Sequence, residues 1–270
     1  MDHPISTPDR GRPLALVTGA SAGIGRAFAW RLGAEGYDLL VAGRRRDRLE
    51  ELAAELPEAR VRPLVADLGD DAGVAVIAEA CGAEPLTMLV NNAGLAHYMP
   101  FAELPASQAA ELLHVKAVAP TMLARAAVPG MVARGGGTII NVSGMLAFSG
   151  PAPLDQLPLR RAVYTGTLAY TLALSQVLHE ELTSQGIRVQ VLCPGVVATE
   201  FHERQGLDLS AVPRMSADDV VTASLRGLEL GEVVCAPGVE NPGLLDAVFR
   251  ADLAAFGAQA PQLAARYQAG

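Results

Sequence analysis

A glycine-rich turn near the start of the chain constrains the fold more than any other stretch. Residues 14–17 are a short apolar run that predicts a buried strand, and a helix is predicted from 26 to about 36. Between them, Gly19 permits a tight turn, Gly23 permits close approach of the backbone to a ligand, and Gly25 lets the helix pack near the strand. The free N–H groups and positive dipole end of that helix favour a pyrophosphate. The expected dinucleotide-binding turn comprises Gly19, Ser21, Ala22, Gly23, Ile24 and Gly25.

Short apolar runs and helical stretches continue to alternate along the chain. Further strands are expected at 37–42, 61–66, 86–90, 138–142, 187–192 and 231–236. Half of the residues are hydrophobic and few are aromatic, which suits helices layered on a buried parallel sheet. We therefore expect an α/β fold: a single-domain, Rossmann-type, doubly wound parallel sheet of about seven strands with helices on both faces. Residues 1–12 are expected to be a flexible tail and 13–270 one domain, because no linker long enough for a second domain follows.

Charge and cysteine content exclude several classes of function. A net charge of −8 argues against a nucleic-acid partner, because phosphate backbones need a basic face. The three cysteines, Cys81, Cys193 and Cys235, are scattered, which suits reduced thiols and predicts no metal site. The sequence has no apolar run of about 18 residues and no apolar signal-peptide core, so we expect a cytoplasmic protein without a membrane partner.

Arginines follow the second expected strand, where a dinucleotide site meets the adenosine ribose. An acidic residue there would bind the 2′-hydroxyl of NAD, whereas arginine suits the 2′-phosphate of NADP. Arg44 and Arg45 occupy this place and no acid does, so the sequence predicts NADP(H) as cofactor. Arg46 and Arg48 are expected instead to begin an exposed helix that pairs them with glutamates at 50 and 51.

Several short motifs follow one another along the chain in a characteristic order. The turn at 18–25 is followed by Asp67, by Asn-Asn-Ala-Gly at 91–94, by Asn-Val-Ser at 141–143, by Tyr164 and by Pro194-Gly195. This order resembles the short-chain dehydrogenase/reductase family over about residues 13–238. The resemblance implies that Asp67 and Leu68 flank the adenine, that 92–94 line the ribose side, and that 197–215 cap the substrate. It also assigns to the cofactor site Asn92, Ala93, Gly94, Pro194, Gly195, Val197 and Thr199.

The catalytic half of the family pattern is altered in this sequence. Reduction in the family uses a Tyr as proton donor, a Ser that hydrogen-bonds the same oxygen, a Lys four residues after the Tyr, and an Asn on the long preceding helix. Tyr164 matches, but Gly144 and Leu168 stand at the Ser and Lys positions, and Lys116 stands at the Asn position. Ser143 lies one residue from the Ser position and is expected to face the opposite way. Ser149 lies at nearly the usual distance, on a loop.

Lys116 is the only lysine among 21 basic residues. We hypothesise that it supplies, from the neighbouring helix, the ammonium that Leu168 lacks. A cation at about 4 Å is worth up to ~4 kcal/mol at an effective dielectric near ~20, enough to lower the pKa of a phenol by roughly 2–3 units. The alternative is an exposed lysine without a role. His97, on the loop after 91–94, is more simply explained as a solvated side chain than as an acid or base.

These observations favour a function without settling it. Reduction needs a protonated Tyr164, which a phenol of nearly ordinary pKa provides, whereas alcohol oxidation needs a phenolate. We expect an NADPH-dependent carbonyl (ketone) reductase of small-to-bulky hydrophobic substrates, assembled as a homodimer or homotetramer. The Pro-rich connection at 144–162 would add a wall to its substrate site. Two alternatives stay open: a redox-neutral enzyme (cyclase, dehydratase or lyase) that keeps the cofactor as scaffold, and an inactive binding protein.

Overall fold

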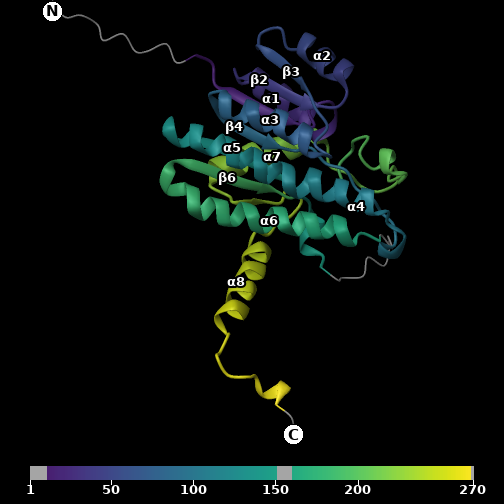
Figure 1. The fold of residues 1–270 in the computed structure, drawn as a ribbon, viewed down its shortest axis with the longest axis vertical. Coiled ribbons are helices and arrows are strands. Elements are labelled where there is room, and N and C mark those ends of the chain that lie inside the picture. The colour runs from purple at the N-terminus through teal and green to yellow at the C-terminus, as the bar shows by residue number, and fades with distance from the viewer. Residues whose placement is uncertain (1–10, 151–159, 269–270) are drawn as a thin grey trace, which may run out of the picture. The chain divides into compact units, whose positions relative to one another are not determined.

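The computed structural model describes residues 11–150 and 160–268, and the described residues up to Pro237 belong to one compact unit (Figure 1). A parallel sheet of seven strands, in the order β3-β2-β1-β4-β5-β6-β7, lies at its centre. The strands are β1 (Leu14–Thr18), β2 (Asp38–Gly43), β3 (Val61–Val65), β4 (Leu86–Asn91), β5 (Gly137–Val142), β6 (Ile187–Leu192) and β7 (Val234–Cys235). The predicted α/β fold is therefore confirmed, although β7 is shorter than the run expected at 231–236.

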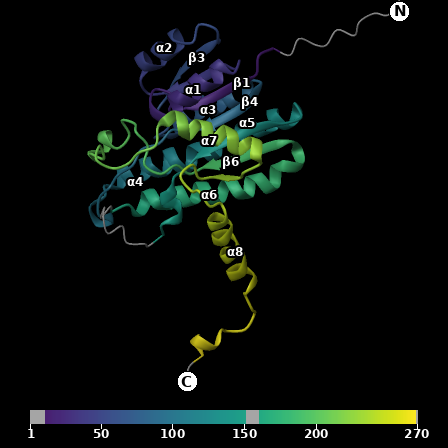
Figure 2. The same cartoon turned by 180° about the vertical axis from the view of Figure 1, so that it is seen from behind.

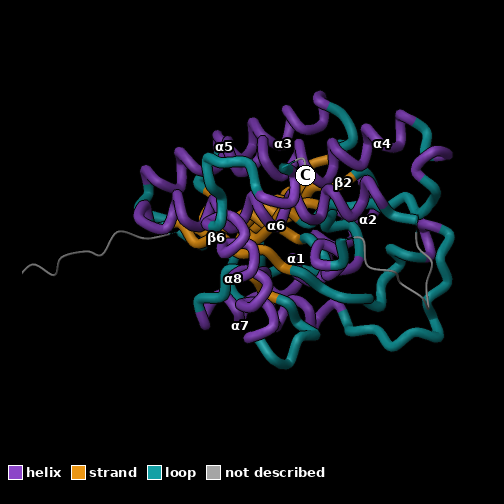
Figure 3. The backbone as a smooth tube through the Cα atoms, turned by 90° about the horizontal axis from the view of Figure 1, so that it is seen from below, coloured by secondary structure: helices purple, strands orange, loops and turns teal. Residues whose placement is uncertain are grey.

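Helices cover both faces of the sheet (Figures 2 and 3). They are α1 (Gly23–Ala34), α2 (Arg46–Ala54), α3 (Asp71–Ala83), α4 (Ala106–Leu113), α5 (Ala119–Ala133), α6 (Ala162–Leu182) and α7 (Ala217–Leu230). Alternation along each strand sends side chains into two separate cores. Leu16 of β1 packs with α3, α5 and α6, whereas Ala15 and Val17 pack with α1, α2 and α7.

The long helical stretch between β4 and β5 consists of three consecutive segments. Between α4 and α5 lies a π-helical turn, η2 (His114–Val118), and Pro120 stands at the start of α5. Pro120 is the second residue of α5, in the first turn, where its missing N–H is tolerated, so the helix continues past it. The π turn carries Lys116, and such turns occur often at functional sites.

Short 3₁₀ turns complete the first unit, and a second unit follows it. The turns are η1 (Phe101–Glu103), η3 (Met145–Phe148), η4 (Thr183–Gln185) and η5 (Glu203–Gln205). Residues from Gly238 onward are a separate compact unit with the expected terminal helix α8 (Gly243–Gly257) and a last turn η6 (Ala265–Tyr267). Nearly all of the expected N-terminal tail, and 151–159 of the Pro-rich connection, lie outside the described residues. Among the residues that are described, no helix is both long and apolar enough to span a membrane.

The strand order places an opening for a ligand between β1 and β4. The chain leaves β1 toward β2 on one side and reaches β4 on the other, so the loops after these two strands diverge. Those loops are the glycine-rich turn and the segment that begins with Asn92. The two loops are in close contact at Gly25. A Cβ added to Gly25 would collide with the Asn92 amide and the Gly19 carbonyl, so only a residue without a side chain fits there.

This contact gives a stability prediction. Replacing Gly25 with Ala should lower the free energy of unfolding by about 1–3 kcal/mol, because the added methyl group overpacks two turns. Gly166→Ala on α6 is the matched control, since its Cβ meets no atom within 4 Å. It should raise stability by about 0.5–1 kcal/mol through helix propensity. Urea unfolding of both variants measures the difference, and equal effects would show that the turns do not need Gly25.

Candidate active site

One cavity of about 840 Å³ lies at the carboxyl ends of the strands. The residues predicted for cofactor binding and catalysis all line it except Gly25, which is buried beneath the turn. The predicted residues that line the cavity are Gly19, Ser21, Ala22, Gly23, Ile24, Arg44, Arg45, Asp67, Leu68, Asn92, Ala93, Gly94, Lys116, Tyr164, Pro194, Gly195, Val197 and Thr199. The cavity thus joins the region predicted for a dinucleotide to the region predicted for chemistry.

The glycine-rich turn has the backbone conformation that an anion site needs. Gly19 and Gly23 adopt φ values of +67° and +53°, which side chains disfavour. A Cβ on Gly23 would lie 3.1 Å from the Thr199 side chain, so only glycine lets the capping segment approach. Helix α1 begins here without a side-chain cap and without an acidic residue in its first turn. Its N–H groups and dipole are therefore left for a ligand anion, which fits a pyrophosphate.

Thr18 ties the turn to the loop after β4. Its hydroxyl accepts hydrogen bonds from the backbone N–H groups of Asn92 (2.9 Å) and Ala93 (3.0 Å). The Asn92 amide in turn donates to the Thr18 carbonyl at 3.0 Å. Asn91 is buried and donates to Asn141 at 2.9 Å, bracing the neighbouring strand ends. These bonds hold the ribose side of the predicted cofactor site in place.

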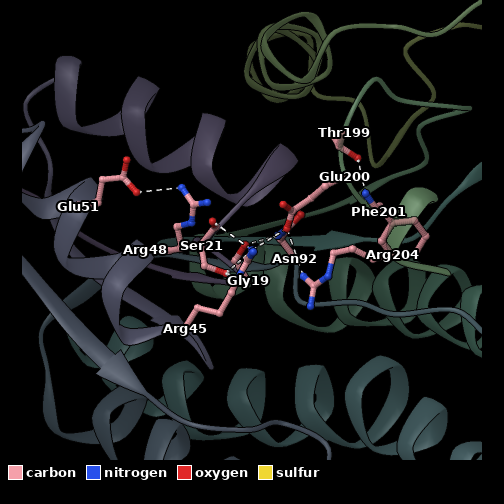
Figure 4. A network of polar contacts seen from close by, with 10 residues as sticks. All are labelled: Gly19, Ser21, Arg45, Arg48, Glu51, Asn92, Thr199, Glu200, Phe201 and Arg204. Carbon is pink, nitrogen blue, oxygen red and sulfur yellow. Dashed lines mark hydrogen bonds and ion pairs between the residues drawn. The ribbon is translucent and has the colours of Figure 1, made fainter. Parts of the chain in front are cut away.

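Both arginines predicted to bind the 2′-phosphate already contact carboxylates. The Arg45 Nη2 donates to Glu200 at 2.7 Å and to the Ser21 hydroxyl at 3.1 Å (Figure 4). Arg44 lies 3.5 Å from Asp67 and 3.7 Å from Glu111. The exposed helix expected after them is α2.

Arg46 and Arg48 pair along α2 as expected. Arg46 lies 3.6 Å from Glu50, and Arg48 lies 3.1 Å from Glu51. These contacts belong to the helix surface and leave the cavity to Arg44 and Arg45.

Tyr164 enters the cavity from α6 within a cluster of aromatic rings. Its ring lies edge-on to Tyr98, with 5.6 Å between centroids, and 6.5 Å from Phe201. Burial raises the pKa of Tyr164, and the charge and hydroxyl of Tyr98 raise it further. Burial also raises the pKa of Tyr98 to about 12, opposed by the hydrogen bond to Tyr164. Both phenols are therefore protonated near neutral pH, with their hydroxyls facing each other.

Lys116 is buried, with 5% of its surface exposed, so the alternative of an exposed lysine is wrong. Its ammonium donates to the Val142 carbonyl at 2.8 Å and lies against Gly94. Burial lowers the pKa of Lys116 to about 8. The expected fall in the pKa of Tyr164 is not found, because burial and Tyr98 determine that pKa among the described groups and both raise it. Desolvation of the phenol is the largest of these causes.

Gly144 and Leu168, which were predicted to replace the family's Ser and Lys, lie close together. Leu168 is fully buried below Tyr164 on α6, and a Cβ on Gly144 would meet its side chain at 3.5 Å. The Ser143 hydroxyl donates to the Leu168 carbonyl at 2.9 Å, so it is engaged by the helix backbone. Ser149 lines the cavity, where its hydroxyl donates to Leu146 and accepts from Arg161. Ser149 is thus held in place by hydrogen bonds to both of these residues.

Three residues of the site were not identified from the sequence. Tyr98 follows His97 on the loop after 91–94, and Glu200 and Phe201 lie within the segment predicted to cap the substrate. The order of Thr199, Glu200 and Phe201 after a cofactor-binding loop is a weak signal that could have drawn attention to them. His97, by contrast, lies 3.4 Å from Glu111 and outside the cavity lining.

The unusual lysine can be measured directly because it is the only one in the chain. In protein labelled with ¹³C-lysine, a single Cε resonance should titrate with a midpoint near 8, well below the ordinary value of 10.5. The same resonance in urea-unfolded protein should titrate near 10.5, which controls for the label. A folded-state midpoint above 10 would show that water reaches the ammonium.

The chain is similar to known oxidoreductases along most of its length. The family model described as short chain dehydrogenase matches residues 13–209. The very-long-chain 3-oxoacyl-CoA reductase of Mus musculus is 30% identical over 223 residues, which is 80% of this chain and 68% of the mouse protein. The reductase of the same name from Pyrenophora tritici-repentis is 32% identical over 198 residues, or 70% of this chain. The match spans only 56% of that fungal relative.

Solved structures extend the similarity to the fold. A short-chain dehydrogenase from Sphingobium yanoikuyae in complex with NADPH superposes with a TM-score of 0.88 at 33% identity, covering 94% of this chain and all of the other. The bulky-bulky ketone specific alcohol dehydrogenase from Comamonas testosteroni has a TM-score of 0.85 at 27% identity, covering 96% and 100%. With the matched motifs, the shared fold and the site at the expected sheet edge, this chain belongs to the short-chain dehydrogenase family of oxidoreductases.

Proposed function

We propose that the protein is an NADPH-dependent carbonyl reductase of hydrophobic ketones, in which Tyr164 is the proton donor. The observation that carries this proposal is the position of Tyr164, whose buried, protonated phenol faces the same cavity as the glycine-rich turn. A phenol with a raised pKa keeps its proton at neutral pH, so the phenolate that alcohol oxidation needs is scarce, and reduction is the better match. The NADPH complex of the Sphingobium relative supports the choice of cofactor.

The cavity walls support a hydrophobic substrate. Around Tyr164, apolar side chains contribute to the lining from Leu95, Met145, Leu146, Phe201 and Leu209. Most of the exposed cavity surface is therefore suited to a ketone with apolar substituents, held by a few polar groups. The substrates named for the relatives support this class, since 3-oxoacyl-CoA and bulky ketones both contain a carbonyl group.

The proposed mechanism rests on residues of this chain. Bound NADPH would supply a hydride to the carbonyl carbon, and the glycine-rich turn with Arg44 and Arg45 would hold the cofactor. Tyr164 donates its phenolic proton to the carbonyl oxygen. Tyr98, whose hydroxyl meets that of Tyr164, donates a second hydrogen bond to the same oxygen in the place of the family serine. One such donor is worth about 3 kcal/mol of barrier, so Tyr98 would offset what Gly144 lacks.

Lys116 completes the proposed site as a buried positive charge. It does not lower the pKa of the resting Tyr164, but it lies against Gly94 on the predicted ribose side. As Tyr164 loses its proton to the substrate, negative charge develops within the same low-dielectric cavity, where a fixed cation is most effective. We propose that Lys116 stabilises this charge, a task that the family assigns to the lysine replaced here by Leu168.

A redox-neutral enzyme is the second candidate. It is favoured by the same departure from the pattern, because Gly144 and Leu168 remove two groups that assist reduction while the cofactor region stays intact. In that case Tyr164 and Tyr98 would act as acid and base on a substrate held beside the cofactor.

Homodimer or homotetramer formation and a cytoplasmic location remain predictions.

Removing the Tyr164 hydroxyl tests the proposed proton donor. With NADPH and a panel of aryl and alkyl ketones, Tyr164→Phe should lower kcat by about 10²- to 10⁴-fold and leave NADPH affinity unchanged. Tyr170→Phe is the matched control, because the Tyr170 hydroxyl bonds only Thr121 among the described residues, at 2.8 Å. Wild-type protein that binds NADPH without oxidising it across the panel would favour the redox-neutral reading.

Removing the Tyr98 hydroxyl tests the second donor. Tyr98→Phe keeps the ring that packs on Tyr164, so folding and NADPH affinity should be retained. We expect kcat to fall by about 10²-fold, as for the loss of one donor to a developing oxyanion. An unchanged kcat, measured beside the same Tyr170→Phe control, would remove Tyr98 from the mechanism.

A further inference from the structure

An ion pair joins two walls of the cavity that are 155 residues apart in the chain. Arg45 stands at the end of β2 as the N-cap of α2, and Glu200 belongs to the predicted capping segment. Their side chains meet at 2.7 Å, and the same guanidinium donates to the hydroxyl and carbonyl of Ser21 (Figure 4). Arg45 is thus held between the glycine-rich turn and the cap.

The Glu200 carboxylate is charged and well placed for this contact. Its pKa is lowered, first by the hydrogen bond from Arg45 and then by the charges of Arg45 and Arg204. Arg204 approaches the same oxygen at 3.2 Å from within the capping segment. Glu200 therefore remains ionised at neutral pH and occupies the face of Arg45 turned toward the cap.

The proposed function assigns a different partner to Arg45. The guanidinium that Glu200 binds is one of the two expected to bind the 2′-phosphate of NADP(H). A phosphate and a carboxylate compete for one guanidinium and repel each other when close. The 2′-hydroxyl of NAD(H) carries no charge and cannot displace a carboxylate from an arginine.

We propose that Glu200 is an internal competitor of the 2′-phosphate, occupying Arg45 in the cofactor-free protein and setting the affinity for NADP(H). This inference rests on the proposed use of NADP(H). Binding of NADP(H) exchanges the carboxylate for the phosphate on Arg45, and Glu200 then keeps Arg204 as its partner. Arg44 has no equivalent device, because its contacts with Asp67 and Glu111 are longer and its side chain is half exposed.

The exchange is positioned to reach the catalytic end of the cavity. Glu200 lies between Thr199, which packs against Gly23, and Phe201, which packs against Tyr164. The Phe201 N–H donates to the Thr199 hydroxyl at 3.3 Å, so the three residues form one short bonded segment. Release of Glu200 from Arg45 therefore frees the segment that carries an aromatic wall of the substrate region.

Binding of the oxidised cofactors, measured by calorimetry without any substrate, tests the proposal. Glu200→Gln should bind NADP⁺ about three- to tenfold more tightly than wild type. The expected gain in affinity has two sources: the phosphate no longer displaces a partly exposed ion pair of modest strength, and a negative charge that repels the phosphate is removed. NAD⁺ affinity should change by less than about twofold, since no phosphate competes. Glu203→Gln, exposed on the same segment, removes the same charge without touching Arg45 and should leave both affinities unchanged.

Two double variants assign the effect to Arg45. In an Arg45→Gln background, Glu200→Gln should no longer tighten NADP⁺ binding. Glu200→Gln combined with Arg204→Gln should keep the gain, whereas its loss would mean that the freed Arg204 binds the phosphate instead. Unchanged or weaker NADP⁺ binding by Glu200→Gln would overturn the proposal. Wild-type protein that prefers NAD⁺ would instead contradict the proposed cofactor, a distinct result.

Discussion

Contact between the glycine-rich turn and the loop after β4 is the constraint on which the site depends. Gly25 brings the start of α1 so close to Asn92 and Gly19 that no side chain fits between them. The Thr18 hydroxyl then satisfies two N–H groups of the facing loop. Because β1 and β4 are neighbours at the switch point of the sheet, this packing sets the width of the cavity. The turn predicted to bind the pyrophosphate and the loop predicted to line the ribose side are therefore joined by packing and by hydrogen bonds.

Burial then decides the chemistry of the groups around this frame. Desolvation raises the pKa of Tyr164 and lowers the pKa of Lys116, so both neutral forms are favoured relative to water. At neutral pH Tyr164 therefore keeps its proton, and Lys116, with a pKa of about 8, stays mostly charged. A protonated Tyr164 is consistent with reduction, whereas alcohol oxidation needs the phenolate. Leu168 and Gly144 contribute to this desolvation, because Leu168 is buried and apolar and Gly144, which has no side chain, lies beside it.

The polar end of the cavity follows a different rule. Arg45 is only partly exposed and needs a partner, and the cap provides Glu200 in the absence of a ligand anion. A charged group on the predicted capping segment is thus paired with an arginine of the predicted cofactor region, so the two walls of the cavity are joined by an ion pair. Arg44 is also paired with carboxylates, but its contacts with Asp67 and Glu111 are longer and its side chain is more exposed than that of Arg45.

Much of the fold and of the cofactor region was predictable from sequence, because these features depend on local patterns. Strand runs, helix periodicity and the glycines of the turn depend on residues within a few positions of one another. The partner of each charged or phenolic group was not predictable, because it depends on loops that meet only in the folded chain. Tyr98 and Glu200 reach Tyr164 and Arg45 from distant segments, and the direction of the Tyr164 pKa follows from packing. The sequence by itself determined the scaffold and the glycine-rich turn at its ligand opening. Tertiary structure decided which side chains share the cavity, since desolvation and ion pairing act between residues close in space.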